Sequence, residues 1–150
     1  MTFGETQRYE SGNTSSADAQ WRSLVPRTHQ GYVRLGPDRR VFALAMFHEL
    51  HCMATFHRAL VWHEHPDANP GHFQHCLNYL RQLFMCAADT TLEPYDFMTQ
   101  DYSIGRAGVT RQCRDWSMVY READDNWTGW FAYASAINHT ALSGLSENWD

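Results

Sequence analysis

Histidine and cysteine recur at short, regular intervals in the middle of the sequence. The phrase His-x-x-His-Cys occurs twice, as His48, His51, Cys52 and as His72, His75, Cys76. In an α-helix, residues three and four positions apart share a face, so each phrase would present its side chains on one side of a helix. Imidazole binds copper, zinc, iron and nickel, and it also transfers protons near neutral pH. The two phrases therefore predict a metal site or an acid–base site.

A histidine-only metal site is the first chemistry that these residues allow. The phrases contain no carboxylate except that of Glu49, which favours copper over a carboxylate-bridged di-iron centre. We therefore expect copper as the cofactor and O2 as the co-substrate of an oxidase. The expected metal ligands and catalytic residues are His48, His51, His72 and His75. Cys52 and Cys76 could be further ligands or a disulfide between the two helices.

The second chemistry needs no metal. The same histidines could serve as general acid and base in a redox-neutral cyclisation or dehydration, because imidazole titrates in the required range. Arg111 or Arg114 would then stabilise developing negative charge. A third alternative is a non-catalytic partner subunit or a binding module that a metal holds together.

Two helices must carry the His-x-x-His-Cys phrases. Residues 41–62 and 72–89 lack Gly and Pro, whereas the nine residues between them contain two Pro and one Gly, so we expect two helices joined by a short loop and packed antiparallel. Asp38 is expected to cap the first helix. His57 lies about 180° around that helix from His48 and should face away. His63 and His65 lie in the loop and should be solvated.

The remaining pattern predicts a mainly α fold, a small helical domain with irregular loops and a short β-hairpin. Residues 1–20 are polar and rich in Ser and Thr, which is typical of a flexible arm. Residues 21–135 form the domain, and 136–150 form a C-terminal tail. Strand is expected near Tyr32 and Val33, and a third helix from about Cys113 to Ala123.

Asp89 and Arg114 are the polar side chains outside the phrases that we expect at the site. Asp89 ends the second helix, where it could satisfy the turn formed with Thr90 and Thr91. It could instead accept the second N–H of an imidazole, a contact that metal-bound histidine usually makes. Arg114 is catalytic in the acid–base alternative, and its simplest other role is an ion pair with Asp115.

Cys86 and Cys113 form a second cysteine pair. Cys86 lies on the same face of its helix as His75, about three turns further along. A disulfide from Cys86 to Cys113 would tie the third helix to the second in an oxidising compartment. As free thiols, both would more often be buried.

Composition limits the classes of partner. The chain has 150 residues, 43% of them hydrophobic, which is enough for one domain with a core. Its net charge is −5, so a nucleic-acid backbone is excluded as a partner. All 12 basic residues are Arg, which excludes Schiff-base chemistry on lysine. Sequons at Asn13, Asn126 and Asn138 lean toward the secretory pathway.

The stretches "FHELHC", "HFQHCLNYLRQLFMCAADTTLEP" and "QCRDW" together resemble the UstYa-like family of fungal biosynthetic oxidases. The resemblance covers roughly Trp21 to Trp130. It implies a tailoring enzyme that oxidises or oxidatively cyclises a peptide or polyketide-type intermediate, with copper implicated in several members. It also implies a homodimer, or a heterodimer with a related protein, as a possible assembly.

The sequence departs from the family pattern in two places. Family members commonly carry an N-terminal membrane anchor and a lumenal domain, but no signal peptide and no apolar run of about 18 residues is visible here. We expect the secretory-pathway lumen if an anchor has been removed, and a soluble cytoplasmic protein otherwise. A His often precedes the late Cys-Arg-Asp of the family, whereas Arg111 stands near that position here.

Overall fold

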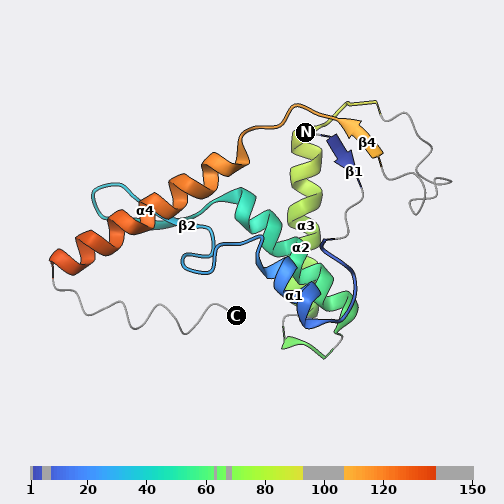
Figure 1. Cartoon of the computed structure of the whole chain (residues 1–150), viewed down its shortest axis with the longest axis horizontal. Coiled ribbons are helices and arrows are strands. Elements are labelled where there is room, and N and C mark those ends of the chain that lie inside the picture. Colours follow the sequence, from blue (N-terminus) through green and yellow to red (C-terminus); the bar gives the residue numbers. More distant parts are fainter. Residues whose placement is uncertain (1, 5–7, 63, 67–68, 93–106, 138–150) are drawn as a thin grey trace.

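The computed structural model describes residues 2–4, 8–62, 64–66, 69–92 and 107–137 (Figure 1). The elements, in chain order, are β1 (Thr2–Gly4), α1 (Ser15–Arg22), β2 (Tyr32–Leu35), β3 (Arg40–Ala43), α2 (Ala45–Val61), α3 (Pro70–Ala87), β4 (Ala107–Thr110) and α4 (Trp116–Ala136). The strands form two antiparallel pairs, β1 with β4 and β2 with β3. The predicted mainly α fold with a short hairpin is therefore confirmed.

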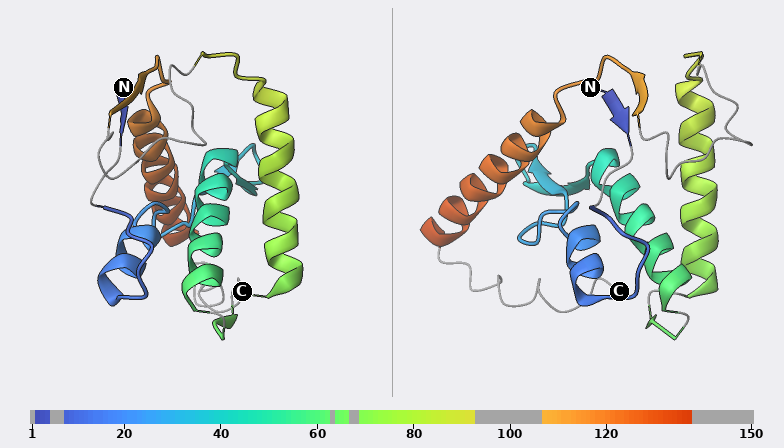
Figure 2. Two further views of the ribbon diagram at one scale, coloured as in Figure 1. Left: turned by 90° about the vertical axis from the view of Figure 1, so that its right-hand side faces the viewer. Right: turned by 45° about the vertical axis from the view of Figure 1, so that its right-hand side comes forward.

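The helices α2 and α3 lie side by side and run in opposite directions, as predicted (Figure 2). The start of α3 is fixed by its sequence, because Pro70 occupies the first turn and the Asn69 side chain accepts a hydrogen bond from the Gly71 backbone N–H at 2.8 Å. The helix ends at Ala88, which has a left-handed backbone with φ 42°.

The start of α2 differs from the prediction. Residues 41–43 were expected to be helical, but they belong to β3, which pairs with β2 in the register Tyr32 to Ala43 and Leu35 to Arg40. A turn that includes Gly36, with φ +76°, brings the two strands together, and tertiary pairing then overrides the helical pattern. The N-cap of α2 is Leu44 and makes no side-chain capping bond, so the expected cap by Asp38 was wrong.

The end of the expected N-terminal arm contains a helix. The Thr14 side chain caps α1 by accepting a hydrogen bond from the Ala17 backbone N–H at 3.1 Å. Trp21 then stacks on His57 of α2, with ring centroids 5.1 Å apart. Asp18 is buried and reaches Arg58 of α2 at 3.5 Å. The prediction of a flexible arm to residue 20 is therefore corrected from Ser15 onward, and His57 does face away from His48.

The long helix α4 supports the β2–β3 hairpin. It begins at Trp116, capped by Asp115, and continues to Ala136, beyond the predicted end at Ala123. The Asn126 side chain accepts a hydrogen bond from the Arg34 backbone N–H at 2.7 Å and donates one to the Arg34 carbonyl at 2.9 Å. Because this amide is occupied, the sequon at Asn126 has a structural role in the folded chain.

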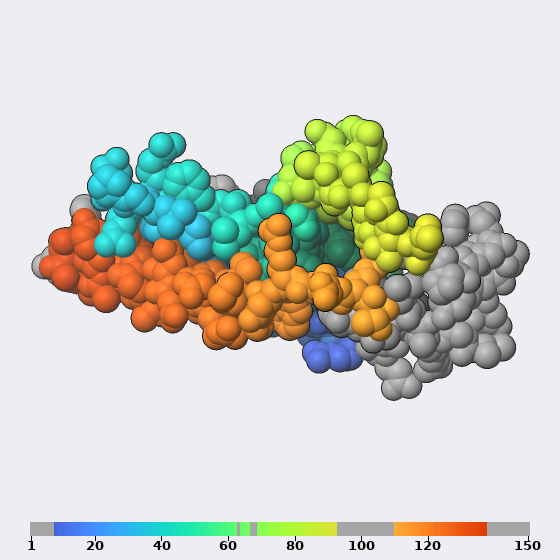
Figure 3. All heavy atoms as spheres, turned by 90° about the horizontal axis from the view of Figure 1, so that it is seen from above, coloured from blue at the N-terminus to red at the C-terminus, as the bar shows by residue number. Residues whose placement is uncertain are grey.

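The described residues form two small cores. One combines Val33 of β2, Phe47 of α2 and Ala123 of α4. The other lies between α2 and α3 and combines Cys52, Cys76 and Leu80. In Figure 3, α3 stands apart from α4, with α2 visible between them. None of the helices in the described ranges has the length and apolarity needed to cross a membrane.

All four cysteines are free thiols in the structure, so neither the Cys86–Cys113 nor the Cys52–Cys76 disulfide is present in it. Cys52 and Cys76 are fully buried and hydrogen-bond to one another, whereas Cys86 and Cys113 are exposed. The expectation that Cys86 and Cys113 would be buried as free thiols is therefore wrong. Proximity between Cys52 and Cys76 follows from the antiparallel packing that the sequence predicted.

The first prediction compares two glycines with similar left-handed backbones. Gly31→Ala would drive its new Cβ into the side chain of Phe47, whereas Gly36→Ala would meet nothing within 4 Å. We expect Gly36→Ala to lower the free energy of unfolding by about 1 kcal/mol through backbone strain, and Gly31→Ala by about 2–4 kcal/mol because overlap adds to strain. Urea unfolding measures both values. Equal losses would contradict the packing of Gly31 on Phe47.

The second prediction concerns thiol reactivity. Brief treatment of the native, reduced protein with N-ethylmaleimide should modify Cys86 and Cys113 and leave Cys52 and Cys76 intact, because only exposed thiols meet the reagent. Peptide mass spectrometry locates the modified residues. The same treatment in denaturant, where all four should react, is the control. Modification of Cys52 in the native protein as fast as Cys86 would contradict the buried α2–α3 core.

Candidate functional site

The four histidines of the repeated phrase meet between α2 and α3. The Nε2 atoms of His51 and His72 are 3.3 Å apart, and the ring centroids of these residues are 5.3 Å apart. His48 stacks on His75 with a centroid separation of 5.5 Å. In antiparallel helices, the later residue of α2 meets the earlier residue of α3, which explains both pairs. Helical spacing therefore predicted the convergence correctly.

All four imidazoles line one cavity of about 610 Å³. The cavity is also lined by residues of α1, of the loop that follows α1 and of the β2–β3 hairpin. Its apolar lining includes Trp21, Val25, Leu44 and Phe47. This volume lies within the range of about 300–1,000 Å³ that is usual for small-molecule sites. The histidines are thus accessible from a space that can hold a ligand.

Burial and the neighbouring imidazoles both lower the pKa of His48. Burial lowers the pKa of His48, and the neighbouring imidazoles of His75 and His72 lower it further. When His51 and His72 are both neutral, one Nε2 donates a hydrogen bond and the other accepts it. Neutral imidazole is the form that binds metals and the form that takes up a proton.

The spacing of His51 and His72 fits a shared metal ion. Two nitrogen ligands with bonds of about 2.0–2.1 Å and a tetrahedral angle lie about 3.3–3.4 Å apart. The observed Nε2–Nε2 separation of 3.3 Å matches that spacing. Within the described ranges, however, no three His, Cys, Asp or Glu side chains surround a common point. The two nitrogens therefore form a ligand pair, and rotation of the His48 or His75 ring would be needed to complete a larger set.

Burial raises the pKa values of three polar neighbours of the histidines, Tyr79, Glu49 and Cys52. Tyr79 stacks on His48 at 4.1 Å, and burial is the main cause that raises the pKa of Tyr79. Burial also raises the pKa of Glu49 above its usual value. The pKa of the Cys52 thiol is raised strongly, first by burial and then by its hydrogen bond with Cys76. Burial thus favours the thiol form of both cysteines.

Asp89 lies outside the cavity lining. Its carboxylate accepts hydrogen bonds from the Thr91 backbone N–H at 2.9 Å and from the Thr91 hydroxyl at 2.6 Å, and it forms an ion pair with Arg111. These Thr91 bonds are the main cause that lowers the pKa of Asp89. Of the two predicted roles, the turn is the one observed, and none of the described histidines is a hydrogen-bond partner of Asp89.

Arg114 is exposed and is not part of the cavity lining. Its expected partner Asp115 instead accepts a hydrogen bond from the Met118 backbone N–H at 3.2 Å and lies 3.8 Å from Arg121. The structure therefore does not bring Arg114 to the four histidines. His65 also lies outside the lining and stacks on Trp62, while His63 is outside the described residues.

Two groups of cavity residues were missed by sequence reasoning. Arg58 lies seven positions after His51, so the helical spacing that linked the histidines could have identified it. Trp21, Arg22 and Arg27 come from α1 and the loop after it, and no spacing in the sequence connects them to α2. Their place depends on how α1 docks, which is a tertiary property.

His29 is a further residue that the sequence did not single out. It is buried, it lies 3.0 Å from an Asp124 carboxylate oxygen, and its Nδ1 accepts a hydrogen bond from the Gly31 backbone N–H at 3.2 Å. Because Nδ1 is the acceptor, Nε2 carries the proton that is donated to Asp124. His29 thus positions Gly31, a cavity-lining residue, against α4.

This chain is similar in sequence to several known proteins. Oxidase ustYa of Aspergillus flavus is 35% identical over 93 residues, 60% of this chain and 43% of that protein. The UstYa family oxidase phomYb of Diaporthe leptostromiformis is 32% identical over 131 residues, 75% of this chain and 51% of that protein. Hydroxylase cctR of Talaromyces islandicus is 26% identical over 150 residues, 83% of this chain and 54% of that protein.

This chain spans about half the length of these relatives. No solved structure gives a significant match. The sequence profile described as "Mycotoxin biosynthesis protein UstYa" matches residues 3–136, which include every helix of the structure. Because this match covers nearly the whole chain, the protein belongs to the UstYa family.

Proposed function

We propose that this protein is a tailoring oxidase of fungal natural-product biosynthesis that uses copper and O2 to oxidise, or oxidatively cyclise, a peptide or polyketide-type intermediate. The observation that carries the proposal is the pair of imidazole nitrogens of His51 and His72, 3.3 Å apart at the wall of a cavity of about 610 Å³. Relatives that bear the names oxidase and hydroxylase support the oxidative class of reaction.

The donor set supports copper in particular. The described lining residues include four histidines and no Asp or Glu, and all-nitrogen sites suit copper better than hard cations. His51 and His72 would hold the ion, with His48 or His75 as a further ligand after ring rotation. Bound copper would supply the electron exchange with O2 that no side chain of this cavity can supply.

The protein's own residues account for positioning and proton transfer. Trp21, Leu44 and Phe47 provide an apolar surface on which the substrate can lie and from which water is excluded. His48, whose pKa is lowered, is neutral at physiological pH and can accept a proton from the substrate. Tyr79, stacked on His48, limits the orientations of that ring.

The neutral state of His48 also supports a second function, a redox-neutral cyclase or dehydratase with the histidines as acid and base. The two functions differ in their requirements. An oxidase loses product formation when a chelator removes the metal or when O2 is excluded. Full turnover of the biosynthetic intermediate in EDTA under anaerobic conditions would reject the oxidase and favour the acid–base reaction.

The third prediction tests the metal ligands. We expect protein purified without a His tag to bind copper, and the double variant His51→Ala, His72→Ala to lose at least about tenfold in affinity, because two of its nitrogen donors are gone. Competition with a copper-binding dye measures the affinity. His65→Ala removes a histidine outside the cavity and serves as the matched control.

Circular dichroism of the same variants distinguishes a loss of metal ligands from a loss of folded structure. A folded double variant that binds copper as tightly as the wild type would contradict the assignment of His51 and His72. Equal losses in the double variant and in His65→Ala would also contradict it, since binding would then depend on histidine content and not on the site.

A further inference from the structure

The charges around the cavity are strongly one-sided. The cationic lining residues are Arg22, Arg27 and Arg58, and no Asp or Glu is among the described residues that line the cavity. The whole chain, in contrast, has a net charge of −5. The chain has an excess of carboxylates, but none of the described residues of this wall carries one. Such an arrangement attracts anions into a cleft whose apolar walls concentrate the field.

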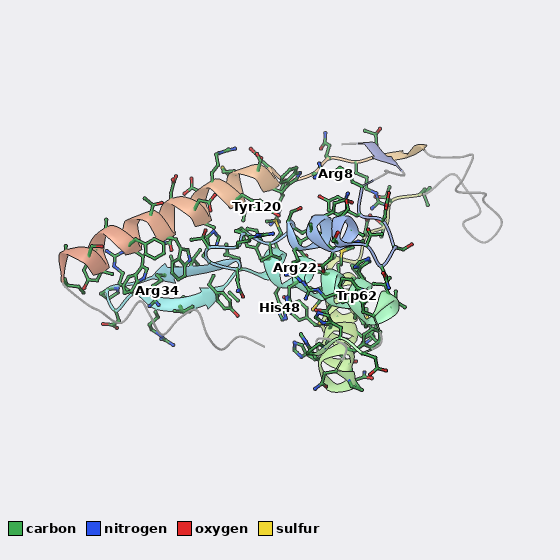
Figure 4. All side chains as sticks on the ribbon, turned by 60° about the horizontal axis from the view of Figure 1, so that its bottom comes forward. Arg8, Arg22, Arg34, His48, Trp62 and Tyr120 are labelled. Carbon is green, nitrogen blue, oxygen red and sulfur yellow. The ribbon has the colours of Figure 1, made fainter. Side chains whose placement is uncertain are left out.

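The three arginines come from different parts of the chain. Arg22 is the last residue of α1, Arg27 follows in the loop toward β2, and Arg58 lies on the face of α2 that carries His51. In Figure 4, Arg22 and His48 are close together in projection, in agreement with their shared place in the lining. The cationic wall and the imidazoles therefore border the same space.

One carboxylate partly compensates this charge from behind the wall. Asp18 lies 2.7 Å from Arg22 and 3.5 Å from Arg58, measured from a carboxylate oxygen to each Nε atom. Asp18 is itself buried and is not a lining residue. Among the described side chains, this one carboxylate is shared by the guanidinium groups of Arg22 and Arg58, and Arg27 adds a third cation to the wall.

Guanidinium groups recognise carboxylates by paired hydrogen bonds, and the side chain of Arg58 is only 13% exposed. A charge held away from water binds an oppositely charged group more strongly than one on the open surface. Ion pairing to Asp18 orients Arg22 and Arg58 before a ligand arrives, which reduces the entropy lost on binding.

We propose that the cavity selects a substrate that bears a carboxylate, which the wall formed by Arg22, Arg27 and Arg58 binds while the reacting part of the molecule faces the four histidines. The term substrate rests on the proposed function, but recognition of the carboxylate does not require the metal. The opposing explanation is that Arg22 and Arg58 only fasten α1 to α2 through Asp18. That explanation predicts no preference for anionic ligands.

The test compares two probes that differ only in charge, N-acetyl-phenylalanine and its C-terminal amide, with metal-free protein. Calorimetry or ligand-observed NMR measures both dissociation constants. We expect the wild type to bind the carboxylate about tenfold more tightly, the effect of one charge-assisted hydrogen bond, and to lose this preference as salt is raised. Equal affinity for the two probes would overturn the proposal.

Variants of single arginines show which side chains cause the preference for the carboxylate probe. Arg27→Gln changes an exposed side chain at the rim and should fold normally, and Arg58→Gln removes the most enclosed cation. Each should weaken binding of the carboxylate and leave binding of the amide unchanged. Arg81→Gln, on the exposed side of α3, is the matched control and should change neither. Equal weakening of both probes in Arg27→Gln would overturn the assignment.

The probe-binding experiment and the copper titration test the two proposals separately. If copper binds at His51 and His72 but the carboxylate is not preferred, the oxidase stands and the substrate class is wrong. If the carboxylate is preferred but copper does not bind, the anion site stands and the metal-dependent function is wrong.

Discussion

Contact between Cys52 and Cys76 is the constraint on which the site depends. Both side chains are fully buried where α2 meets α3, and both are small. Two helices approach closely only where small side chains face each other, and close approach brings His51 to within 3.3 Å of His72. A larger residue at either position would push the helices apart and separate the imidazoles. The cysteine of each His-x-x-His-Cys phrase thus sets the spacing that its histidines need.

The rest of the fold completes the cavity around this pair of helices. Stacking of Trp21 on His57 holds α1 on α2, and this docking places the arginine wall at the cavity. On the other side, Asn126 of α4 holds the β2–β3 hairpin, and His29 holds Gly31 against Phe47. Imidazoles, guanidinium groups and aromatic side chains line this one cavity, a combination that suits an anionic, partly apolar molecule.

Sequence reasoning succeeded where the signal was local. Helical spacing and the Pro-rich loop predicted α2, α3 and the meeting of the four histidines, because each depends on neighbours a few positions apart. It failed at residues 41–43, where pairing with β2 overrode a helical pattern. It also missed Arg22 and Arg27, because their place at the cavity depends on how the 8-residue helix α1 and the loop after it dock on α2.

The central claim is that one metal ion binds between α2 and α3 through histidines of both phrases. Anomalous X-ray diffraction from copper-loaded crystals, collected on both sides of the copper absorption edge, tests it most directly. The account predicts an anomalous peak about 2.0–2.1 Å from the Nε2 atoms of His51 and His72. A peak at His65 or at the exposed cysteines, with none between the two helices, would contradict it.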